Sequence, residues 1–99
     1  MKRPDHVIIM GRRYSVLYVP EPKAEGGESS IGYVDPLKQE IRIWDGCCVQ
    51  RELDVLLHEI IHVLSDDLCL GMEENAVHAL GVALADTLIR NGMMTMEGG

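Results

Sequence analysis

The chain of 99 residues has the length of one compact domain, which we expect to span residues 1–99. Its formal net charge of −7 argues against binding to nucleic acid or to an anionic membrane, because both need a basic surface. No stretch approaches the roughly 18 apolar residues of a membrane span, and the apolar run at 7–10 is too short for a signal peptide. The three cysteines form no CxxC motif, so we expect reduced cysteines in a cytoplasmic protein.

The first half of the chain reads as a series of short strands. Apolar and β-branched runs at 7–10 and 14–19 precede a segment rich in Pro, Gly and Ser at 20–30, which we expect to be a mobile loop. Two further runs follow at 31–35 and 39–44. In the second of these, Ile41 and Ile43 alternate with polar residues, as in a half-buried strand. We therefore expect an antiparallel meander of three or four strands.

The second half reads as two helices. Apolar residues recur at spacings of three and four from 49 to 66 and again from 73 to 91. The pair Asn91-Gly92 is typical of a helix end, and the tail at 93–99 has no pattern, so we expect it to be disordered. Strands followed by helices predict the α+β class.

Residues 58–62, HEIIH, form a candidate metal-binding motif on the first helix. His58 and His62 lie one helical turn apart and can offer two imidazole nitrogens to one metal ion. Glu59 lies beside such an ion without having to ligate it, and can take a proton from a metal-activated water. The alternative is a pair of core histidines that carboxylates or backbone groups satisfy. The spacing favours a Zn²⁺ site with Glu59 as the general base of amide hydrolysis.

A catalytic zinc usually has three protein ligands, so a third must come from elsewhere in the chain. The positions where a metzincin would carry Gly and His hold Ser65 and Leu68, which excludes that class. The candidates lie at the start of the second helix. Glu73 lies one turn before Val77 and two before Leu80, near the middle of the apolar stripe of this helix, so we expect Glu73 as the ligand, with Glu74 and then His78 as alternatives. Either glutamate could instead complement the helix N-terminus.

The run VLLHEIIHVL resembles the extended signature of the HExxH zincin metallopeptidases, and a glutamate on the next helix resembles their gluzincin division in minimal form. The segment 31–91 is similar to small phage and prophage-encoded metallopeptidase domains of the ImmA/IrrE or SprT-like type. This resemblance implies a small sheet, an active-site helix and a second, ligand-bearing helix. It implies that His58 and His62 bind zinc, that Glu59 is the base, and that a glutamate at 73 or 74 completes the site. It also implies that substrate backbone pairs with the strand at 39–44, and that the protein works in the cytoplasm of a bacterial host.

We therefore expect a zinc-dependent peptidase that acts on a peptide or protein substrate. The alternative is a catalytically weak or inactive, zinc-stabilised module that binds a peptide strand or regulates a partner. The intact Glu59 favours the peptidase, because metal binding alone does not need it. The small size favours the module, as does the lack of an assigned oxyanion helper, for which the candidates are Tyr14, Tyr18, Tyr33 and His78.

Overall fold

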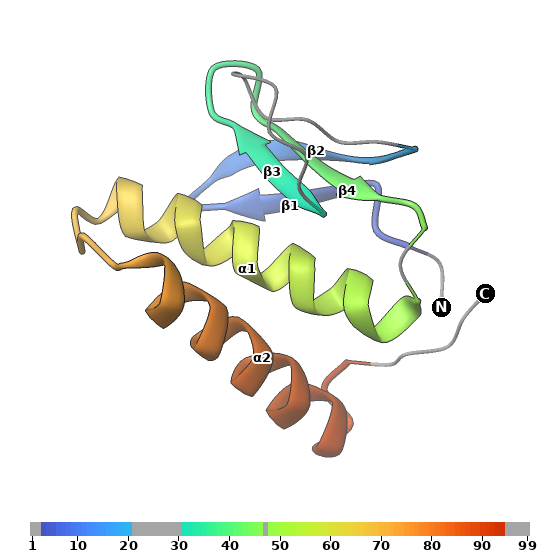
Figure 1. Ribbon diagram of the computed structural model, residues 1–99. Coiled ribbons are helices and arrows are strands. Elements are labelled where there is room, and N and C mark those ends of the chain that lie inside the picture. Colours follow the sequence, from blue (N-terminus) through green and yellow to red (C-terminus); the bar gives the residue numbers. More distant parts are fainter. Residues whose placement is uncertain (1–2, 21–30, 47, 95–99) are drawn as a thin grey trace.

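The computed structural model describes residues 3–20, 31–46 and 48–94, which form one sheet and two helices (Figure 1). The elements in chain order are β1 (His6–Ile9), β2 (Arg12–Val19), β3 (Gly32–Asp35), β4 (Glu40–Trp44), α1 (Val49–Asp67) and α2 (Glu74–Arg90). The α+β class is confirmed, and each element lies within two residues of its predicted bounds. The predicted mobile loop at 20–30 and disordered tail at 93–99 fall almost entirely outside the described residues.

The sheet is mixed, so the prediction of an antiparallel meander was wrong. Its order is β1-β2-β4-β3, with β2 and β4 parallel and the outer pairs antiparallel. Ile41 and Ile43 of β4 are 0% exposed, whereas every residue of β3 is half-buried. The central position therefore goes to the strand with the more apolar face. The connection from β2 to β4 is long enough for the crossover that a parallel pair needs.

Helix α1 lies between the sheet and α2 (Figure 1). On the sheet side, Val55, Leu56 and Val63 join Ile41 and Ile43 in the main apolar cluster. On the other side α1 packs against α2, which contacts no other described element. Because α1 is covered on two sides, its apolar stripe is wide, and the polar residues of HEIIH lie where these two contact surfaces meet.

No helix in the described part of the chain is both long and apolar enough to cross a lipid bilayer.

Candidate metal centre

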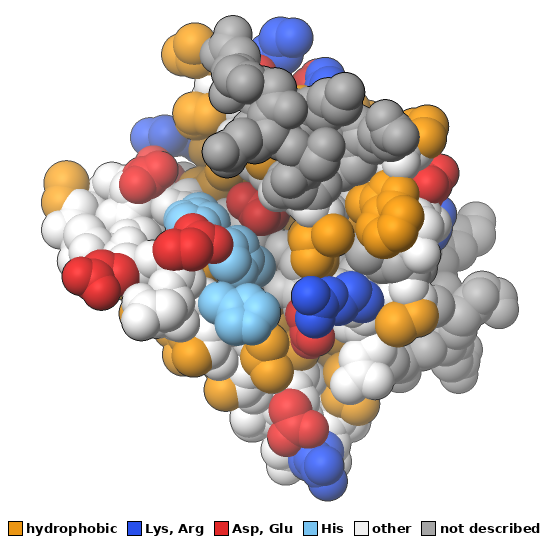
Figure 2. Space-filling model, viewed as in Figure 1, with side chains coloured by type: hydrophobic (Ala, Val, Ile, Leu, Met, Phe, Trp, Pro, Cys, Tyr) orange, Lys and Arg blue, Asp and Glu red, His pale blue; other side chains and the backbone are white. Residues whose placement is uncertain are grey.

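His58 and His62 project from α1 toward the beginning of α2. Their Nε2 atoms are 3.1 Å apart, and their ring centroids are 4.8 Å apart. Glu74 meets both rings from α2, with Oε1 at 2.6 Å from His58 Nε2 and Oε2 at 2.8 Å from His62 Nε2. Within the described residues, these three side chains form a group whose donor atoms all lie within 4.8 Å of one another. Figure 2 shows histidine side chains gathered on this face of the molecule beside acidic ones.

The third member of the group is Glu74, the first alternative, and not Glu73, which we had ranked above it. Helix α2 begins at Glu74, and Glu73 is the N-cap residue, with an extended backbone at φ −75 and ψ 157. The predicted position of Glu73 assumed that this residue was already helical, so its direction was assigned incorrectly. His78 follows Glu74 by one turn, and its ring centroid lies 6.0 Å from that of His58. His78 is thus a neighbour of the group and not a member.

The connection between the helices directs Glu74 toward the histidines. Ser65, buried near the end of α1, accepts a hydrogen bond at Oγ from Met72 N at 3.0 Å, and its carbonyl accepts one from Leu70 N at 2.9 Å. Cys69 and Gly71 take positive φ values of 54 and 61, which reverse the chain within a few residues. The sequence offered no clear signal for this geometry, because it depends on where α1 ends and α2 begins.

The two helices approach closely beside His58. Gly81, two turns beyond Glu74 on the buried face of α2, lies so near α1 that a Cβ there would be 3.3 Å from the His58 backbone nitrogen. Because Glu74 and Gly81 are seven residues apart, they share one helix face. The contact at Gly81 therefore sets the distance across which Glu74 reaches the two imidazoles.

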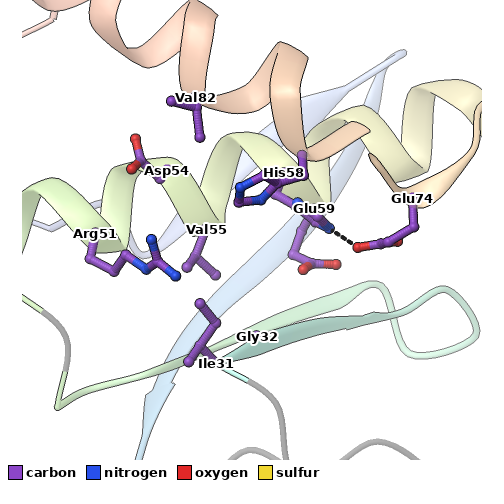
Figure 3. A pocket seen from close by; sticks show the side chains of 10 residues that line it. Ile31, Gly32, Arg51, Asp54, Val55, His58, Glu59, Glu74 and Val82 are labelled. Atoms are coloured by element: carbon purple, nitrogen blue, oxygen red, sulfur yellow. Dashed lines mark ion pairs between the residues drawn. The ribbon is translucent and has the colours of Figure 1, made fainter. Parts of the chain in front are cut away.

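Glu59, the next residue of α1, points toward β3. Its carboxylate lies on the side of Gly32 in Figure 3, and the residue is only 6% exposed. Burial, together with the negative charge of Glu74, raises the pKa of Glu59 to about 7. Burial also lowers the pKa of His58, an effect that Glu74 partly offsets. A carboxyl group with a pKa near 7 can both hold and release a proton at neutral pH.

The donor set has the composition of a catalytic zinc site. Two imidazole nitrogens and one carboxylate oxygen are a common zinc ligand set that leaves a fourth position open. Donor atoms around a tetrahedral zinc lie about 3.3 Å apart, as follows from bond lengths near 2.0–2.2 Å. The two imidazole Nε2 atoms are 3.1 Å apart, close to this spacing, and each of them contacts a different oxygen of Glu74. With one ligand atom from each residue, the three atoms lie within 4.8 Å of one another, so the side chains would have to adjust around an ion.

A pocket of about 240 Å³ opens beside the group, between α1, α2 and the start of β3 (Figure 3). Besides His58, Glu59, Glu74 and His78, it is lined by residues that the sequence analysis did not single out: Ile31, Gly32, Arg51, Asp54, Val55 and Val82. The sequence carried a signal for the three of these that lie on α1. Arg51, Asp54 and Val55 precede His58 by seven, four and three residues and so share its side of the helix.

The structure also separates the candidates for an oxyanion helper. Tyr14 is 2% exposed in the core, Tyr18 donates to the carbonyl of Pro4 at 2.9 Å, and Tyr33 accepts from Arg42 at 3.2 Å. None of these tyrosines lines the pocket, whereas His78 does.

The strand expected to pair with substrate lies in the interior of the sheet. The segment 39–44 contains β4, which is flanked by β2 and β3, so it has no edge to offer to a substrate. The outer strand next to it is β3, which also packs against α1.

No family model matches the chain, and searches of curated proteins and of solved structures gave no match. The function must therefore be argued from the residues of this chain.

Proposed function

We propose that the protein is a zinc-dependent peptidase whose metal is held by His58, His62 and Glu74 and whose general base is Glu59. The observation that carries the proposal is the convergence of three donor side chains next to a buried carboxyl group. A purely structural metal site has no need for that fourth group. The resemblance of the HEIIH helix to zincin peptidases points to the same chemistry.

When bound, zinc supplies Lewis acidity, which lowers the pKa of a water molecule to about 7 and polarises a carbonyl group. The side chains of the protein would transfer protons and stabilise the oxyanion. Glu59, at the pocket wall, accepts the proton of the attacking water and passes it to the leaving amine. The positive charge of a bound ion would lower the raised pKa of Glu59, which favours its role as base at neutral pH. His78 is the remaining candidate to donate a hydrogen bond to the developing oxyanion.

Metal analysis of matched variants tests the ligand set. We expect about one zinc per chain in the purified protein and its loss in His62→Ala and Glu74→Gln. Glu73→Gln is the matched control, because it removes the same charge one residue earlier, and it should retain zinc. Retention of zinc in Glu74→Gln together with its loss in Glu73→Gln would contradict the assignment of the third ligand.

Peptide cleavage in Glu59→Gln tests the base. This variant keeps the side chain's shape and should keep its zinc, while cleavage of a quenched fluorescent peptide library should fall about 10²–10⁴-fold. If the zinc-loaded wild-type protein cleaves no peptide, the peptidase proposal fails, and the remaining function is that of a zinc-stabilised binding module.

A further inference from the structure

The pocket extends away from the metal group along α1. Glu74 and His58 lie at one end and Arg51 at the other, with Val55 between them (Figure 3). Ligand pockets for drug-sized molecules measure about 300–1,000 Å³, so a pocket of about 240 Å³ suits a single side chain or a chain end. Ile31, Val55 and Val82 supply its apolar surface.

Among the described residues that line the pocket, Arg51 alone carries a permanent positive charge. Its guanidinium lies on the side of Val55 that faces Ile31, whereas the carboxylate of Asp54 is turned toward α2 and Val82 (Figure 3). The other carboxylates of the pocket, on Glu59 and Glu74, lie at the metal end. Burial raises the pKa of Asp54, and the positive charge of nearby Arg51 partly offsets this rise. The far end of the pocket therefore carries a positive and a negative group, and a negative group on a ligand would find its partner in the guanidinium of Arg51.

The spacing fits a substrate group close to the reacting bond. Arg51 precedes His58 by seven residues, which is about 10 Å along the helix axis. An extended peptide advances about 3.5 Å per residue, and the arginine side chain itself covers part of the separation. A carboxylate one or two residues from the scissile carbonyl is thus within reach of the guanidinium.

We propose that Arg51 makes this pocket selective for a carboxylate next to the scissile bond, carried either by an acidic side chain or by the C-terminus of a short peptide. The inference rests on the proposed peptidase site, because it takes the metal group as the place of reaction. Arginine binds carboxylates through two parallel hydrogen bonds, so it distinguishes a carboxylate from the amide of the same shape. In a chain with a net charge of −7, acidic ligands would otherwise be repelled.

Peptide binding tests the proposal without requiring turnover. The protein is Glu59→Gln loaded with zinc, and the probes are fluorescent hexapeptides with Glu, Gln or Lys at one position at a time. Each peptide is made with a free and with an amidated C-terminus. We expect the Glu peptides, the free C-termini or both to bind about 10-fold more tightly than their neutral counterparts. The comparison of Glu with Gln peptides tests an acidic side chain as the source of the carboxylate, and the comparison of free with amidated peptides tests the C-terminus.

Variants at the far end of the pocket test whether Arg51 causes the preference for a carboxylate. Arg51→Gln should abolish it, Arg51→Lys should restore part of it, and Asp54→Asn should leave it in place. Because Arg51 is exposed, neither substitution of Arg51 should alter the thermal midpoint by more than a few degrees. The proposal is overturned if wild-type Arg51 gives no preference for a carboxylate, or if the preference survives in Arg51→Gln. A preference for Lys that disappears in Asp54→Asn would assign the pocket to basic side chains and would also overturn it.

The outcomes separate this inference from the peptidase proposal. A protein that selects carboxylates through Arg51 but cleaves nothing retains the inference and loses the catalytic function. A protein that cleaves peptides, but whose binding shows no preference that depends on Arg51, retains the catalytic function and loses the inference.

Discussion

Gly32 is a residue at which the sheet lies close to the HEIIH helix. A Cβ at this position would lie 2.4 Å from Val55 Cγ1 and 3.2 Å from the carbonyl oxygen of Arg42, but 3.6 Å from Glu59 Oε2. The first contact would require Val55 to move, and the second is tighter than most Cβ contacts, whereas the third is an ordinary van der Waals distance. The absence of a side chain therefore allows β3 to lie against α1 at the wall of the pocket, without fixing the position of Glu59 itself.

We predict that Gly32→Ala lowers the free energy of unfolding by about 1–3 kcal/mol, the usual cost of an overpacked contact. Zinc content should be unchanged, because the added methyl group does not reach the metal group. Urea unfolding followed by circular dichroism measures the change. In the double variant Gly32→Ala/Val55→Ala the clashing methyl groups of valine are gone, so the loss should be smaller than the sum of the two single losses. Simple additivity would mean that the contact with Val55 is not the cause.

At the scale of elements, the position of α2 on α1 decides whether the metal group forms. Val77, Gly81 and Ala85 are the buried residues of α2, and they are small enough for the helix backbones to approach closely. The nearest atoms to a Cβ at Gly81 are the backbone N and Cα of His58, at 3.3 and 3.4 Å. Backbone atoms cannot move aside as a flexible side chain can, so a larger residue would separate the helices.

We predict that Gly81→Ala lowers zinc affinity about 10-fold and that Gly81→Leu abolishes zinc binding, since each pushes Glu74 away from the histidines. The change to Ala should not weaken the helix itself, because Ala has the higher helix propensity by about 1 kcal/mol. Competition with a chromophoric chelator measures the affinity. Ala79→Leu on the exposed face of α2 is the control for added bulk, and it should bind zinc as the wild type does. Equal affinities for wild type and Gly81→Leu would show that the close approach is not needed.

How much the sequence predicts depends on whether a feature is local. The elements could be predicted, because the periods of strands and helices lie within each segment. His58 and His62 could be paired because both belong to one helix, whose geometry fixes their relation. Glu74 could not be distinguished from Glu73, because the choice depends on the bond between Ser65 and Met72 and on the exact start of α2.

The arrangement of the whole molecule was less predictable, for the same reason. The place of β4 between β2 and β3 depends on how the apolar faces of all the strands compare, and no short sequence pattern contains this information. The pocket depends in turn on how β3 and α2 flank α1, so helical spacing from His58 marked only the lining residues of α1, which are Arg51, Asp54 and Val55. Within the part of the chain that the structure describes, the elements thus form a stack in which α2, the outer layer, packs against α1 alone.

This attachment gives the metal a role in the stability of the whole molecule. The buried contacts of α2 come from a valine, a glycine and an alanine, which cover little apolar surface, while its Glu74 meets two histidines of α1. An ion held by all three would link the outer layer to the rest of the domain and would bind the folded state alone.

At a free zinc concentration 100 times the Kd, such binding stabilises the folded state by about 2.7 kcal/mol. For a domain of this size, we predict a rise of about 10–20 °C in the thermal midpoint, to be measured by calorimetry and reversed by a chelator. Glu73→Gln should show the full rise and His62→Ala none. A similar rise in His62→Ala would mean that zinc acts elsewhere on the protein, and the metal centre assigned to α1 and α2 would be wrong.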